Sequence, residues 1–72
     1  MKVIIKIKSI NNTIIKYSNV VKVYRQDLHI NVDLKENYEV SDEDKKKIRE
    51  HNVSTTPFLH TFYDAEIVAV YE

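Results

Sequence analysis

Lysines and one tyrosine are the residues whose types and spacing best fit a chemical role in this chain. The expected strands place them together on one outward face, which carries Lys6, Lys8, Lys16, Lys22 and Tyr24. Ammonium groups around an aromatic ring can follow a phosphate backbone and stack a base. The competing interpretation is an ordinary solvated sheet face. We favour it, because recognition of nucleic acid would call for more arginine and more aromatic residues.

Other residue types predict no catalytic, metal or cofactor site. The histidines lack any recognised zinc-ligand spacing and stand at His29, His51 and His60. The sequence has no glycine, which excludes the glycine-rich loops that bind phosphates and dinucleotides. Acids gather near one expected strand end, at Asp33, Glu36 and Glu39, but 72 residues leave little volume for a substrate pocket. We therefore expect that the protein is not an enzyme.

Aromatic residues concentrate near the end of the chain. Four of the seven lie in the last fifteen residues, at Phe58, Phe62, Tyr63 and Tyr71. Aromatic side chains fill cores, and they also anchor protein interfaces. Core filling is the favoured interpretation, and the same four residues are the candidate protein-contact face.

The chain is predicted to be organised around a β-hairpin over residues 20–34. Apolar residues alternate on both arms, and a two-residue turn at Gln26-Asp27 keeps the two apolar sets on one face. This register leaves Val20 on the outer face. The inward set is Val21, Val23, Leu28, Ile30, Val32 and Leu34.

Two further strands are predicted before this hairpin, at residues 2–8 and 14–18. A connecting loop of three or five residues keeps their apolar sets together, and either length puts a lysine of the first strand opposite Lys16. At residues 18–19 the chain either turns a tight corner into the hairpin or continues as one bent strand. The sequence leaves these two alternatives open.

One helix and a second hairpin complete the predicted elements. Ser41 is the expected N-cap of a helix over residues 42–51, which has acids in its first turn and bases later. Residues 58–63 and 66–72 are predicted to pair as a closing hairpin over a turn at Asp64-Ala65.

Composition bounds the location and origin of the protein. There is no cysteine, no long apolar run and no leader-like segment, so we expect a cytoplasmic protein without a membrane span. Isoleucine, lysine and asparagine make 24 of the 72 residues, which favours an AT-rich genome. The first 25 residues carry a formal charge of +6 and the remainder −6. This split either marks an anion-facing surface or lets two halves of the molecule attract one another.

These observations predict a single α+β domain over residues 1–72. The expected architecture is a bent antiparallel sheet of five or six strands with one short helix, in the order β-β-β-β-α-β-β, with closure into a small barrel as an alternative. The expected function is a non-enzymatic protein-binding module, such as an inhibitor, adaptor or accessory protein of a phage, virus or mobile element. The alternative is a nucleic-acid-binding module that uses the lysine and tyrosine face. Self-association is a further expectation, because so short a chain buries a small core.

Overall fold

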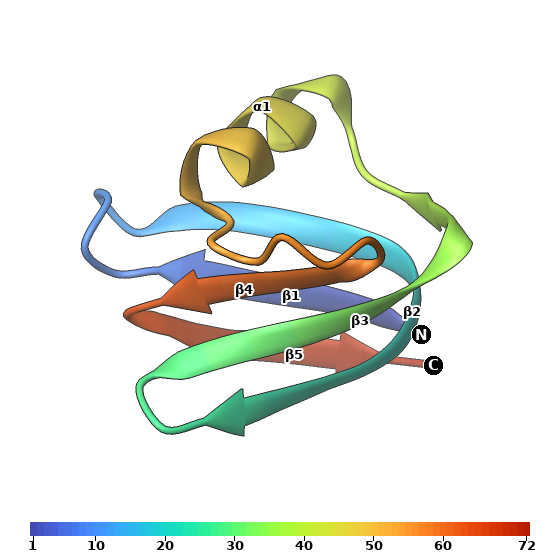
Figure 1. Cartoon of the computed structure of the whole chain (residues 1–72), viewed down its shortest axis with the longest axis horizontal. Coiled ribbons are helices and arrows are strands. Elements are labelled where there is room, and N and C mark those ends of the chain that lie inside the picture. The colour runs from blue at the N-terminus through green and yellow to red at the C-terminus, as the bar shows by residue number, and fades with distance from the viewer.

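A computed structural model describes all 72 residues and shows one bent, five-stranded antiparallel sheet with a single helix. In chain order the elements are β1 (Lys2–Ile7), β2 (Thr13–Gln26), β3 (His29–Glu39), α1 (Asp42–His51), β4 (Leu59–Tyr63) and β5 (Ala65–Tyr71). The strand order across the sheet is β4-β3-β2-β1-β5 (Figure 1). The predicted α+β class is confirmed, and the sheet does not close into a barrel.

Strand β2 is one continuous bent strand, which settles the alternative at residues 18–19. Asn19 has a φ of 61°, and the pairing with β3 shifts register on both sides of Val20. An extra residue in one strand turns the following side chains to the opposite face. Val20 is therefore buried, with 2% of its surface exposed, whereas Val21 is 50% exposed. The predicted orientations of these two valines were wrong.

The β2–β3 turn lies one residue later than predicted. Gln26 pairs with His29, so the two turn residues are Asp27 and Leu28. Tight hairpin turns require positive φ, and Asp27 has a φ of 55°, which aspartate tolerates well. Leu28, expected in the core, is instead 79% exposed at the turn.

The β1–β2 connection has the predicted odd length. Residues 8–12 form a five-residue loop, in which Asn11 and Asn12 take the positive φ that glycine would otherwise provide. The register sets Ile4 opposite Lys16, so the like-charge contact expected across these strands does not form. The inward residues of β1 are buried as predicted: Val3, Ile5 and Ile7.

The predicted closing hairpin is wrong, because β4 and β5 do not pair with each other. Asp64 alone connects them, with a φ of 52°, and β4 pairs with β3 whereas β5 pairs with β1. A two-residue turn is the shortest common hairpin connection, so one residue sends the chain to the other edge of the sheet instead. Lys2 pairs with Tyr71, which brings the two ends of the chain side by side (Figure 1).

The core fills the concave side of the bent sheet. Strand residues supply eleven of its twelve members, and α1 adds Ile48. The helix has the predicted bounds, and its N-cap is confirmed because Ser41 accepts a hydrogen bond from the Asp44 N–H. Figure 1 shows α1 beside the first half of β2, where β3 no longer accompanies that strand.

Candidate functional site

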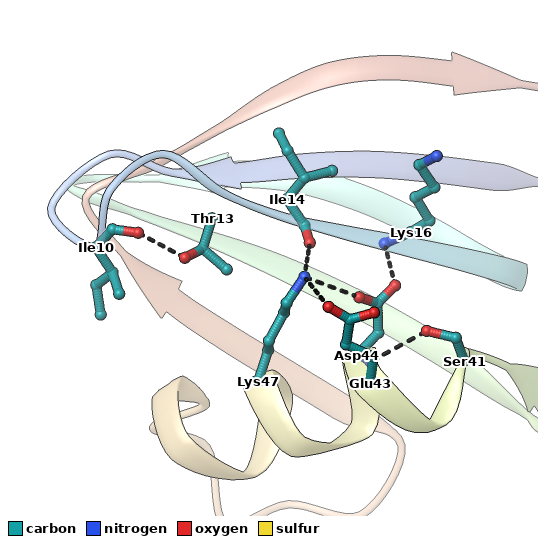
Figure 2. A network of polar contacts seen from close by, with 8 residues as sticks. All are labelled: Ile10, Thr13, Ile14, Lys16, Ser41, Glu43, Asp44 and Lys47. Atoms are coloured by element: carbon teal, nitrogen blue, oxygen red, sulfur yellow. Dashed lines mark hydrogen bonds and ion pairs between the residues drawn. The ribbon is translucent and has the colours of Figure 1, made fainter.

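Helix α1 covers the edge of β2 that the bend of the sheet leaves without a strand. The Asp44 carboxylate accepts a hydrogen bond from the Lys16 N–H at 3.1 Å, and the Lys47 ammonium donates one to the Ile14 carbonyl at 3.1 Å (Figure 2). Residues three apart lie on one helix face, and these two also pair with each other at 3.4 Å. Together they supply the acceptor and the donor that a neighbouring strand would have offered.

The outer edge of β4 is also covered, in this case by the loop that follows the helix. The Val53 N–H donates to the Thr61 carbonyl at 2.9 Å. The Asn52 side-chain carbonyl accepts from the Thr61 N–H at 2.8 Å and from the Ser54 N–H at 3.0 Å. The backbone of Thr61 is therefore hydrogen-bonded on its outer side.

Strand β5 differs, because the strand order ends there and one side of it has no strand partner. No charged residue stands between Ile67 and Tyr71. Four of its apolar side chains are exposed: Ile67, Val68, Val70 and Tyr71. Val68 is an extra residue in the pairing with β1, so the strand is bulged there.

Other stretches with only one strand neighbour carry charges. The second half of β2 pairs with β3 alone and contains Lys22 and Arg25. Charged side chains on an edge strand discourage pairing with another chain. We therefore define the β5 edge, residues Glu66–Tyr71, as the candidate site: an open sheet edge with apolar side chains and little protection.

The predicted aromatic contact face is only partly present at the surface. Phe62 is fully buried in the core, because β4 lies next to β3 and turns this ring towards Ile30. Phe58 and Tyr63 are exposed: Phe58 immediately precedes β4, and Tyr63 is the last residue of β4 and packs edge-on against His29. Tyr71 alone lies on the β5 edge. The assignment of Phe62 to a contact face is therefore corrected.

The predicted lysine face also contains two acids, Glu66 and Asp33. Glu66 pairs with Lys6 at 2.9 Å and with Lys8 at 3.5 Å. Its pKa lies below the ordinary value, chiefly because Lys6 hydrogen-bonds the carboxylate. Lys22 is also partly neutralised, because its ammonium lies 3.8 Å from Asp33. The same ammonium lies 5.0 Å from the centroid of the Tyr24 ring.

Lys16 is the exception on this face. Its side chain is exposed and makes no ion pair, although its backbone N–H is bound by Asp44. Two carboxylates thus lie among four lysines, which reduces the attraction of this face for a phosphate backbone.

A cleft of about 870 Å³ opens beside the contact between α1 and β2. Its ionisable lining includes three acids and two bases: Glu39, Glu43, Asp44, Lys16 and Lys47. Asp44 and Lys47 already bond to the β2 backbone and to each other. These two groups therefore serve the fold.

Tyr17 and His60 form a buried polar pair that sequence reasoning did not find. The Tyr17 hydroxyl lies 2.8 Å from His60 Nδ1. Burial lowers the pKa of His60, which favours the neutral ring, and the Tyr17 hydroxyl and Nδ1 share one hydrogen bond. Burial, reinforced by Tyr38 and the charge of Asp44, raises the pKa of Tyr17. Because each group satisfies the other inside the protein, this pair has a structural role.

No group of three or more histidine, aspartate and glutamate side chains is arranged to hold a metal ion. Helix α1 is too short and too polar to cross a membrane. Comparison with protein-family models, curated proteins and solved structures finds no match to this chain.

Proposed function

We propose that this chain is a non-enzymatic protein-binding module that binds an extended segment of its partner by strand addition at the β5 edge. The proposal rests on the difference between the open edge of β5 and the covered edges of β2 and β4. The chain covers β2 with α1 and β4 with a loop, but leaves one side of the apolar stretch of β5 without a strand partner. The high content of isoleucine, lysine and asparagine, which favours an AT-rich genome, supports an accessory protein of a phage, virus or mobile element. The absence of cysteine supports a cytoplasmic location.

The β5 edge offers both components of strand-addition binding. Unpaired backbone groups provide main-chain hydrogen bonds, and side chains on either face select the bound sequence. Val68, Val70 and Tyr71 are 52%, 48% and 53% exposed, so a partner can cover apolar surface here. The bulge at Val68 interrupts the regular edge, so we expect a short bound segment.

The alternative, nucleic-acid binding by the lysine face, has less support. Lys6, Lys8 and Lys22 are each within ion-pair distance of a carboxylate on the same face. A bound phosphate would have to compete with those carboxylates.

Selection from a library of short extended peptides tests the proposed function without knowledge of the natural partner. Selected peptides are titrated into the wild type, into a double variant Val68→Lys with Val70→Lys, and into the control Val53→Lys. Val53 matches the two valines in residue type and is 50% exposed, but it lies in the loop between α1 and β4.

We expect the double variant to lose about tenfold or more in affinity, because two ammonium groups on the β5 edge oppose pairing, while the control retains wild-type affinity. Equal affinity of wild type and double variant for every selected peptide would contradict the proposal.

A further inference from the structure

The charges at the two ends of β5 restrict which partner segments can pair with this strand. We infer that the bound segment is apolar at its centre and carries lysine or arginine at both ends, and that it is not β5 of a second copy. This inference rests on the proposed strand-addition site.

Unpaired carboxylates stand at both ends of β5. Asp64 immediately precedes the strand and Glu72 immediately follows it, and both are exposed and outside every ion pair of the structure. Glu66 is different, because Lys6 and Lys8 already neutralise it. An added strand would lie about 5 Å from β5, where end charges of opposite sign attract and those of the same sign repel.

Pairing of β5 with itself brings these acids together in either direction. Full antiparallel overlap sets Ala65 of one copy opposite Tyr71 of the other, and thus Asp64 opposite Glu72 at both ends. Parallel overlap sets each acid opposite its own equivalent. Like charges directly opposite one another destabilise strand pairs, so a second copy is a poor occupant of this edge.

The strand already paired with β5 shows the complementary chemistry. Strand β1 has an apolar centre, Val3 to Ile5, between Lys2 and Lys6. Lys6 meets Glu66 at 2.9 Å, and Lys2 pairs with Tyr71, next to Glu72. A segment of the same kind, apolar with basic ends, would place cations beside Asp64 and Glu72 on the open side.

Three synthetic peptides test this inference. They share one apolar centre chosen by the library selection described above, and their ends carry lysine, glutamine or glutamate. Each is titrated into the protein by NMR, at low and at high salt. We expect the lysine-ended peptide to bind about tenfold more tightly than the glutamate-ended one at low salt, with a smaller difference at high salt.

Removal of the two end charges provides the matched comparison. Asp64→Asn with Glu72→Gln should abolish the preference for lysine ends, and asparagine is compatible with the positive φ at position 64. The control is Glu36→Gln with Glu39→Gln, which removes two exposed acids of β3. The control should retain the preference of the wild type.

The outcomes separate this inference from the proposed function. Equal binding of all three peptides, lost in Val68→Lys with Val70→Lys, would overturn the inference and leave strand addition at β5 in place. A dimer that the same double variant dissociates would also overturn it, because the occupant would then be a second copy. Absence of any peptide binding by a monomeric protein would overturn both.

Discussion

The hydrogen bond between Tyr17 and His60 joins the first half of β2 to β4 across 43 positions of sequence. Tyr38 and Phe62 pack around the imidazole with ring centroids 5.6 and 6.4 Å away. A buried imidazole without its hydrogen-bond partner would lose an interaction that water cannot fully replace. This pair therefore links β2 to β4 through a buried polar contact.

Tyr17→Phe should destabilise the fold by about 1–3 kcal/mol, because it leaves His60 Nδ1 buried without a hydrogen-bond partner. Urea unfolding measures the change, and Tyr24→Phe on the outer face is the control with an expected change near zero. Equal stability of wild type and Tyr17→Phe would show that the hydrogen bond contributes nothing net.

The lowered pKa of His60 also predicts a pH dependence. Burial disfavours the imidazolium in the folded protein, so the unfolded chain binds the proton more readily. The free energy of unfolding should therefore be highest above the ordinary pKa of about 6.5 and decrease as pH falls from there towards the folded-state pKa. Urea midpoints between about pH 8 and pH 5 measure this slope. His60→Gln should flatten it, His29→Gln should retain it, and a flat wild-type profile would contradict the assignment.

At the scale of elements, the edge of β2 is covered by α1, which the alternation of apolar residues along the strands does not predict. Asp44 and Lys47 bind the β2 backbone through their side chains, so α1 acts in place of a strand. Asp44 is 8% exposed although it belongs to an otherwise polar helix. Its carboxylate contributes to the fold through Lys16 and Lys47 more than through the helix dipole alone.

Asp44→Ala should destabilise the protein by about 1–3 kcal/mol, because the Lys16 N–H loses its acceptor in a partly buried contact. Asp42→Ala is the matched control, since Asp42 occupies the same first turn but is solvent-exposed. Hydrogen exchange of the Lys16 amide should accelerate in Asp44→Ala only. Unchanged protection of that amide would show that α1 does not cover this edge.

Local pattern predicted the elements better than their partners. The α1 bounds and the inward residues of β1 follow from a cap, a charge gradient and alternation, all of which are local signals. The sequence marked residues 18–19 as a corner or a bend, but local alternation did not reveal the register shift around Val20 that follows the positive φ of Asn19. The closing hairpin failed because alternation fixes a strand's faces but not which neighbour it pairs with.

The candidate site was hardest to predict for the same reason. Tyr71 was foreseen as a contact residue, but the open edge around it is a property of strand order. Which strand lies at the edge of a sheet depends on the order of all the strands. The sequence of β5 alone therefore does not indicate that this strand lies at the edge. The two acids that weaken the lysine face, Asp33 and Glu66, are likewise brought there by pairing with β2 and β1.

At the scale of the whole molecule, the split of charge along the chain is partly offset within the fold, because three of the six bases in residues 1–25 form ion pairs with acids of the remainder. Residues 1–25 carry no acid, yet their lysines meet Glu66 and Asp33 from the acidic remainder. Lys47 and Asp44 add a further contact between α1 and the basic half. Attraction between the two halves therefore explains the pattern better than an anion-facing surface does.

Addition of a mixed-sequence oligonucleotide tests whether the lysine face still binds nucleic acid. Light scattering should show no complex at physiological salt, and Lys16→Glu with Lys22→Glu should behave as the wild type does. A complex that dissociates with salt and is lost in that double variant would promote the lysine face to a binding site and displace the proposed function.

The most direct test of strand addition at β5 is an NMR titration of the isotope-labelled protein with the lysine-ended peptide. The account predicts that the largest amide shifts, together with slowed hydrogen exchange, fall within Glu66–Tyr71. Shifts centred on the lysine face or on the cleft beside α1, with β5 unchanged, would contradict it.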